Sequence, residues 1–315
     1  MKKLLISARS GWLVCICLMV MLQNVSAQTE TDAIMMNKNQ ICIGPTYTYS
    51  SWDHYWEGKL KRENLNLGTV SSQSVMLGAN YGITNDLNVM VMAPWVKTKA
   101  SAGTLHGLEG VQDISLFVKY KALKESLWNG KASIIVVGGV STPLSDYVVD
   151  FLPLSIGLGT TNVSGRVILD YVHKSRVFAT GSAAYIWRSN VKLDRTSYYT
   201  TEQVISNEVK MPDAMSFNFR AGYRGRYLIA EAQIMNMTTL GGFDITRNNM
   251  PFPSNRMNST AVGADFKYTM KWHTNLALIG GASYVIQGRN VGQAMTYTGG
   301  IFYAFYLNKK DRPKS

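Results

Sequence analysis

Apolar and polar residues alternate along most of this chain with a period of two. In the stretch TGGIFYAFYL (298–307), the residues Ile301, Tyr303 and Phe305 share one face. A period of two places successive side chains on opposite faces of a strand. Segments of this kind, about 9 to 11 residues long and separated by turn residues, are typical of transmembrane barrels. They predict an all-β fold, an antiparallel up-and-down transmembrane barrel of about 12 strands.

The strands we expect are 40–50, 73–83, 87–96, 111–121, 131–141, 162–172, 177–188, 214–224, 227–236, 258–268, 275–287 and 296–307. The fifth of them, 131–141, is apolar at nearly every position, so its two faces cannot be assigned. Long and short connections alternate between the strands. Outer-membrane barrels have short periplasmic turns, longer external loops and an even number of strands. The alternation therefore agrees with the count and places the N-terminus in the periplasm.

The first 27 residues are predicted to be a cleaved signal peptide. Lys2, Lys3 and Arg9 form a basic start, residues 11–22 are apolar, and Val25-Ser26-Ala27 is an acceptable cleavage site. The apolar stretch is too short for a spanning helix, which needs about 20 residues. The chain then divides into a short periplasmic N-terminal segment (28–39), the transmembrane barrel (40–307) and a basic C-terminal tail (308–315). We expect export through the periplasm to the cell outer membrane.

The formal net charge of the whole chain is +12, and the signal peptide carries three of those charges, leaving +9. A basic balance often indicates nucleic acid, but the export signal argues against that class of partner. Two interpretations stay open: a barrel in an anionic outer leaflet, or a lumen that favours anions. Cys42 is the only cysteine after the signal peptide, so no internal disulfide is expected.

Three segments resemble a bacterial outer-membrane family named for the meta-pathway of phenol degradation. They are YGITNDLNV (81–89), GVQDISLFVKY (110–120) and GGVSTP (138–143), and they fall within residues 75–145. The family pattern has a Gly-x-Thr-Asp-like turn into a strand, a Gly-Asp strand ending in Lys-Tyr, and a Gly-x-x-x-Pro strand exit. Gln112 stands where the family often has glycine. The resemblance implies a barrel that passes small, often aromatic or apolar, compounds.

Charged residues on the strands are expected to face the lumen, because Arg or Lys facing mid-membrane lipid costs about 2–4 kcal/mol. The predicted lumen-lining residues are Asp113, Lys119, Arg166, Asp170, Arg188, Arg220, Arg224, Glu231, Asp265 and Lys267. One hypothesis is a wet, mildly cation-lined channel that favours anions. The alternative is a set of cross-strand ion pairs that partly fills the lumen. Arg166 and Asp170, two pleats apart on one face, suit the alternative.

The external stretch PLSDYVVDFLPLSIGLG (143–159) is apolar for a water-facing loop. Its candidate binding residues are Tyr147, Val148, Val149, Phe151, Leu152 and Leu154. An exposed apolar patch commonly marks a binding site. The loop could fold into the lumen as a constriction, capture apolar solutes at the surface, or extend the barrel rim.

The last strand resembles the C-terminal signal read by barrel assembly machinery. Gly300 is followed by Tyr303 and Phe305 at alternate positions. Many such proteins end on the aromatic residue itself, whereas this chain continues to Ser315. We expect the strand to close the barrel.

Catalysis is not expected. The histidines are His54, His106, His173 and His273, and all four fall in predicted loops or turns. Neither Gly-x-Ser-x-Gly nor His-Glu-x-x-His occurs, and no Cys/His cluster predicts a metal site, so we expect no metal and no cofactor.

The sequence therefore favours an outer-membrane channel or transporter for small molecules, apolar or aromatic ones among them. A structural or adhesive barrel with a closed lumen is the alternative, and an outer-membrane hydrolase ranks below both. The expected partners are outer-membrane lipid and lipopolysaccharide, the barrel assembly machinery and a small-molecule solute. We expect a monomer that binds no nucleic acid.

Overall fold

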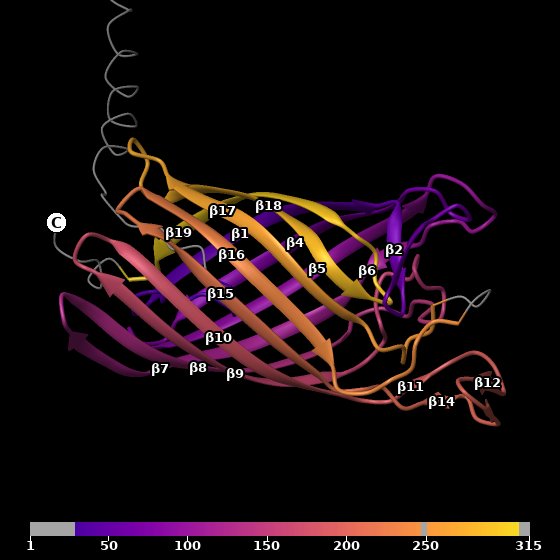
Figure 1. The fold of residues 1–315 in the computed structure, drawn as a ribbon. Helices are drawn as coiled ribbons and strands as arrows, with labels where there is room; N and C mark the ends of the chain where they lie inside the picture. The colour runs from indigo at the N-terminus through magenta and orange to yellow at the C-terminus, as the bar shows by residue number, and fades with distance from the viewer. Residues whose placement is uncertain (1–28, 247–250, 309–315) are drawn as a thin grey trace, which may run out of the picture.

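The structure, a computed structural model, describes residues 29–246 and 251–308. Twelve long strands form one closed antiparallel barrel (Figure 1), as the sequence predicted. The strands are β1 (Gln40–Trp52), β4 (Val70–Gly82), β5 (Leu87–Ala100), β7 (Asp113–Leu127), β8 (Gly130–Pro143), β9 (Asn162–His173), β10 (Val177–Arg188), β15 (Ala214–Arg224), β16 (Leu228–Thr239), β17 (Asn258–Thr269), β18 (Leu276–Arg289) and β19 (Met295–Tyr306). Each pairs with the next barrel strand along the chain, and β19 pairs with β1 to close the ring.

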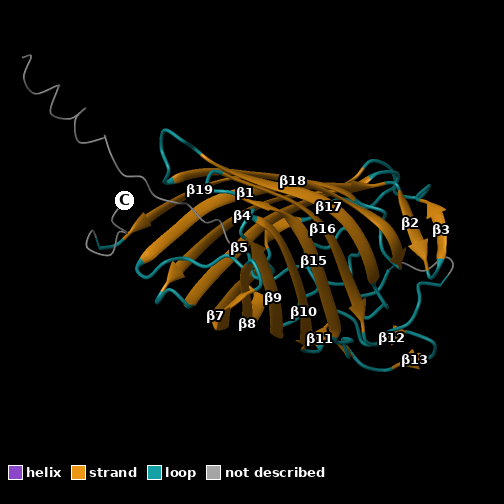
Figure 2. Ribbon diagram, turned by 60° about the vertical axis from the view of Figure 1, so that its left-hand side comes forward, coloured by secondary structure: helices purple, strands orange, loops and turns teal. Residues whose placement is uncertain are grey.

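Shorter strands lie in the long connections (Figure 2). They are β2 (His54–Glu57), β3 (Leu60–Glu63), β6 (Glu109–Val111), β11 (Val191–Lys192), β12 (Tyr198–Tyr199), β13 (Gln203–Val204) and β14 (Glu208–Val209). β6 pairs with the far part of β5, and the other six form three small hairpin sheets. Within the described ranges, no helix is long and apolar enough to cross a membrane.

The two ends of the barrel differ in the length of their connections. At the turn end, strands are joined by short links such as 83–86, 174–176 and 225–227. At the loop end, the connections 53–69, 144–161, 189–213 and 240–257 are long, as the sequence predicted. Figure 1 shows the loops gathered beyond one end of the barrel.

The outward face of the strands is apolar and the inward face is mostly polar. On β15, Phe217 is 42% exposed and Phe219 also faces outward, whereas Asn218 is buried and donates to Gln233 inside the lumen (3.1 Å). Closing the sheet satisfies every strand edge within the protein, which hydrocarbon cannot do. The exterior therefore has the surface that a transmembrane barrel requires.

Residues 29–36, which precede β1 and are called the lumen segment, lie inside the barrel. Ala33 packs in a buried cluster with Ile135 and Val137 of β8. Met36 packs in a second cluster with Phe302 of β19. For this part of the chain the sequence predicted a short periplasmic segment, but residues 29–36 contact the inner face of the wall. The contacts of Ala33 also explain why β8 could not be assigned two faces. Its inner face is apolar because it packs on this segment, and its outer face is apolar because it is the barrel exterior.

The predicted signal peptide, and all of the predicted basic tail except residue 308, lie outside the described residues. Within the described part, exposed basic residues collect at the turn end. They are Lys38, Lys124, Lys131, Lys174, Arg176, Arg226 and Lys271, against the acids Asp86 and Glu125. At the loop end, acidic residues are at least as numerous as basic ones. The basic excess of the described residues thus lies at the turn end of the barrel.

We predict that Phe217→Arg impairs barrel formation far more than Ser216→Arg on the neighbouring inward position. An arginine on the lipid face at mid-membrane costs about 2–4 kcal/mol, whereas one facing the lumen meets water and polar groups. The measurement is the fraction of heat-modifiable barrel on gels after refolding into lipid. Equal fractions for the two variants would contradict the assignment of the faces.

Candidate functional site in the barrel lumen

The ten charged residues predicted to line the lumen all occupy inward positions on their strands. They are Asp113, Lys119, Arg166, Asp170, Arg188, Arg220, Arg224, Glu231, Asp265 and Lys267, none of which is classed as exposed. They do not form an open, uniformly basic wall, because several of them are joined in pairs.

Two cross-strand ion pairs lie among these residues. Arg220 on β15 pairs with Glu231 on β16 at 2.6 Å. Arg224 pairs with Asp170 on β9 at 3.0 Å and lies over the ring of Phe178, 4.1 Å from its centroid. Asp170 therefore pairs with Arg224 on another strand rather than with Arg166 on its own. Pairing of this kind offsets the desolvation of buried charges.

Lys119 binds the lumen segment, residues 29–36. Its side chain is fully buried, and its Nζ donates to Asp32 Oδ1 (3.0 Å), Thr29 O (3.1 Å) and Ile34 O (3.0 Å). These three bonds use all three donors of an ammonium group. Arg220 also donates to Thr31 Oγ1 at 2.6 Å. Lys119 thus holds the lumen segment in place instead of presenting a free charge to a solute.

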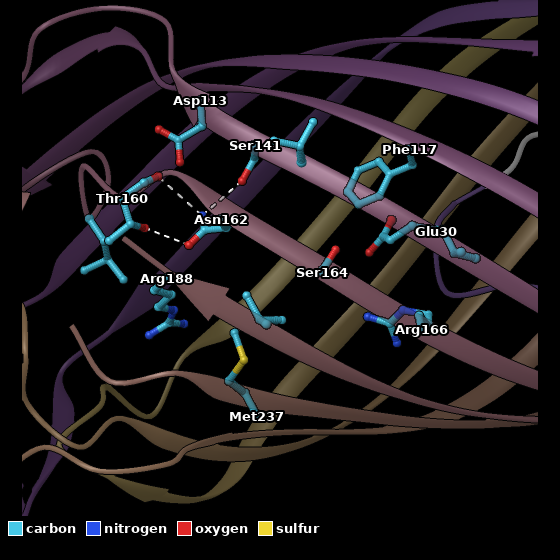
Figure 3. Close-up of a pocket in the computed structure, with 14 residues that line it drawn as sticks. Glu30, Asp113, Phe117, Ser141, Thr160, Asn162, Ser164, Arg166, Arg188 and Met237 are labelled. Atoms are coloured by element: carbon cyan, nitrogen blue, oxygen red, sulfur yellow. Dashed lines mark hydrogen bonds between the residues drawn. The ribbon is translucent and has the colours of Figure 1, made fainter. Parts of the chain in front are cut away.

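A cavity of about 230 Å³ lies in the lumen toward the loop end. Figure 3 shows its polar side chains, among them Glu30, Arg166 and Arg188, which point into it from the lumen segment, β9 and β10. Asn162 donates to Ser141 (3.0 Å) and accepts from Thr160 (2.8 Å) on its wall. We call this the loop-end cavity.

A second cavity, of about 290 Å³, lies closer to the turn end and is called the turn-end cavity. Its wall combines apolar side chains such as Met76, Met92 and Phe302 with the charged Arg220 and Lys267. The Thr46 hydroxyl, buried on the same wall, has no hydrogen-bond partner among the described residues. Glu30 borders the loop-end cavity, and Thr29, Asp32 and Ile34 border the turn-end cavity. The lumen segment therefore lies between the two spaces.

The apolar loop after β8 folds against the other loops at the barrel mouth. Leu154 is 0% exposed and packs in a cluster with Leu67 and Val70, with Phe151 and Trp52 against it. Thr98, on the inward face of β5, donates to Leu154 O at 2.6 Å. The chain leaves the strand at Pro143 and does not continue as an extended rim.

The other predicted residues of this loop divide between buried and exposed positions. Val149 packs against the buried cluster around Val191 on the neighbouring loop, and Leu152 is half-buried. Val148 stays 54% exposed. The hydroxyl of Tyr147 donates to Asp113 Oδ1 (2.6 Å) and accepts from the Gly159 amide (3.0 Å). Burial, and then the bond to Asp113, raise the pKa of the Tyr147 phenol. The loop therefore fixes the carboxylate of Asp113 at the mouth.

A second set of contacts at the loop end was not found from the sequence. Asn290 accepts from the amides of Gly58 (2.8 Å) and Ile245 (3.1 Å) and donates to Arg256 O (2.7 Å). Arg289 forms two bonds with the Asp244 carboxylate, at 2.7 and 2.6 Å. One asparagine thus joins three loops. Its positive φ of 54° is a conformation in which Asn is enriched, and that residue type in a tight turn was the only sequence indication.

The predicted barrel-closing residues lie along the seam between the first and last strands. Gly300 on β19 is opposite Thr46 on β1. Tyr303 faces outward and stacks on His273 (5.8 Å), and it also contacts Phe305 (6.0 Å). Exposed Trp128 and Trp272 lie in the turns of the same end. Aromatic side chains at this level are typical of the membrane interface.

Among the described residues, no group of three or more His, Cys, Asp or Glu side chains is placed to hold a metal ion. His54 pairs with Asp53 (2.8 Å) at the surface, and His173 bonds Ser175 (2.8 Å) in a turn.

Comparison with known proteins supports the fold. No family model matches the chain, and no curated protein matches it. Among solved structures, an outer membrane channel from Pseudomonas putida F1 is similar with a TM-score of 0.67 at 13% identity, covering 89% of this chain and 100% of that one. The NanC porin is more distant, with a TM-score of 0.44 at 10% identity, covering 82% of this chain and 98% of that one. The TodX monoaromatic hydrocarbon channel has a TM-score of 0.42 at 9% identity, covering 87% of this chain and 91% of that one. The chain has the fold of an outer-membrane barrel, and these similar structures are channels and porins.

We predict that Lys119→Met releases the lumen segment, because it leaves Asp32 buried without its cation. Loss of one partner of a buried pair costs about 3–5 kcal/mol. A cysteine introduced by Ala33→Cys should react slowly with a maleimide in the parent barrel and much faster in Lys119→Met. Lys124→Met, on an exposed lysine of the same strand, is the matched control and should leave the reaction slow. Unchanged labelling in Lys119→Met would show that the pair does not hold the segment.

We also predict that the contact of Asp244 with Arg289 and Asn290 persists at acidic pH. Hydrogen bonds from Arg289, and then from Asn290, lower the pKa of Asp244 to about 2. A lowered folded-state pKa stabilises the fold above the ordinary aspartate value, and this contribution is lost as the pH falls through the folded value. At about pH 4, pepsin should therefore cut the Asp244→Asn loops faster than the parent loops, and near pH 2 the difference should vanish. Asp146→Asn serves as the control. A difference that grows below about pH 3 would contradict the assignment.

Proposed function

We propose that this protein is an outer-membrane channel for passage or uptake of small molecules, with apolar and aromatic compounds in its range. The observation that carries the proposal is the pair of lumen cavities on either side of the segment held by Lys119. Both cavities mix apolar walls with a few polar groups, a composition typical of small-molecule sites. The resemblance of residues 75–145 to the phenol meta-pathway family agrees with this solute class.

In this proposal the turn end faces the periplasm and the loop end faces the outside. The lumen segment limits the resting pathway, and the loop that carries Leu154 narrows the external mouth. The exterior contacts outer-membrane lipid, and β19 is the strand recognised by the assembly machinery. One chain closes the barrel by itself, so the proposed pathway lies within a single protomer.

A closed structural or adhesive barrel is the second candidate. It is favoured by the ion pairs Arg220–Glu231 and Arg224–Asp170 together with the lumen segment, which all occupy space that a wide pore would leave to water. The two candidates differ in whether solute crosses the barrel once the segment is removed.

We predict that the mature chain gives small single-channel steps in planar bilayers and that deletion of residues 29–36 gives larger ones. The deletion removes the material between the cavities but leaves all twelve strands. Reversal potentials in a salt gradient should show little preference between anions and cations, because Arg166 and Arg188 share the loop-end cavity with the acids Glu30 and Asp113. Heat-modifiable gel migration confirms that each barrel is folded. Absence of steps from both folded proteins would favour the closed structural barrel.

A further inference from the structure

The loop-end cavity contains one cation whose side-chain hydrogen-bond donors are not used by the described residues. The Arg188 guanidinium lines the cavity, and it makes no ion pair and no side-chain hydrogen bond with the described residues. Asp213 is the nearby acid and acts on the Arg188 charge, but its carboxylate accepts from the Tyr185 hydroxyl and from the Arg188 backbone amide (3.0 Å), not from the guanidinium. The fork of donors on Arg188 therefore remains available, on a partly buried side chain.

The other charged groups of the cavity are already engaged. Arg166 donates to Ser182 (3.0 Å), and Glu30 is the acid that acts on its charge. Asp113 accepts from Tyr147. Each arginine has one acid that acts on its charge, Glu30 for Arg166 and Asp213 for Arg188, but only the Arg188 guanidinium makes no side-chain hydrogen bond with the described residues.

Beside the polar side chains of the wall, the cavity also has an apolar part. Phe117, Leu158 and Ile186 line the same cavity. The volume of about 230 Å³ exceeds that of a cavity known to hold benzene, about 150 Å³, and is smaller than a site for a drug-sized ligand, about 300–1,000 Å³. The space therefore suits a body about the size of a single ring.

We infer that the loop-end cavity is a binding site for a small organic carboxylate, with its carboxylate on Arg188 and its apolar body against Phe117 and Ile186. A guanidinium presents two parallel N–H donors that match the two oxygens of a carboxylate. A neutral molecule of the same shape gains the apolar contacts but leaves Arg188 unmatched. This site names a solute class for the proposed channel and rests on that proposal for its biological role.

Glu30, on the lumen segment, lowers the affinity of this site for anions. Its carboxylate lies in the cavity beside Arg166 and repels an incoming anion. Removing that charge while keeping the shape, as in Glu30→Gln, leaves Arg166 as a second cation for the ligand. Carboxylate affinity should therefore rise by several-fold.

The test is isothermal titration calorimetry of the folded, detergent-purified mature protein with sodium benzoate, and with benzyl alcohol as the uncharged ring. We expect one saturable benzoate site and binding of benzyl alcohol that is weaker by about 10- to 100-fold, the range for losing a hydrogen-bonded charge. Arg188→Gln should weaken benzoate by a similar factor and leave benzyl alcohol unchanged. Arg226→Gln, on an exposed arginine of the turn end, is the matched control. If Arg188→Gln does not fold, Arg188→Lys keeps the positive charge but removes the two parallel N–H donors. It should bind benzoate with intermediate affinity.

Equal affinities for benzoate and benzyl alcohol, or full benzoate affinity in Arg188→Gln, would overturn the site. Binding does not require conduction, so this result is separate from the bilayer experiment. If the barrel binds benzoate through Arg188 but passes no current, the binding site is supported and the channel proposal is wrong. If the barrel conducts but does not bind benzoate, the channel is supported and the binding site is wrong.

Discussion

The closure of β1 on β19 is the constraint on which the rest of the structure depends. A sheet in hydrocarbon cannot leave an edge unpaired, because nothing there replaces the missing hydrogen bonds. Once the ring is closed, every side chain on a strand must face either lipid or lumen. The alternation of the sequence, the inward position of the charges and the outward position of Phe217 and Tyr303 all follow from that choice.

Closure also creates an interior that must be filled or hydrated. In this protein the interior is filled in part by ion pairs and in part by the protein's own N-terminal segment. Lys119 and Asp32 are the centre of that arrangement, and the apolar inner face of β8 provides the surface on which Ala33 packs. The two lumen cavities on either side of this segment are modest in volume, and this favours selective passage over bulk diffusion.

Sequence reasoning predicted the barrel, the number of strands and the alternating loop lengths, because each depends on local periodicity and turn residues. The charges predicted to line the lumen, Arg188 and Asp113 among them, lie on inward positions, and their role in lining a solute path stays a prediction. Sequence reasoning did not predict the partners of those charges. Asp32 meets Lys119 across 87 residues, and Arg224 meets Asp170 across strands, so both contacts depend on the stagger of the closed sheet. The role of Asn290 was missed for the same reason, since the loops that carry Gly58 and Ile245 meet it only in the folded barrel. The uniform apolarity of β8 was the one local sign that something apolar would lie inside.

The position of the lumen segment has a consequence for assembly. It immediately precedes β1, yet it contacts β7, β8, β15 and β19, so its binding surface exists only when strands from all parts of the chain have come together. If the ring closed first, the segment would have to be threaded into it through one of its ends. The simpler order is that the segment is enclosed while the seam between β1 and β19 is still open. In that order the seam between β1 and β19 forms last, and β1 stays unpaired on that edge until β19 has been exported.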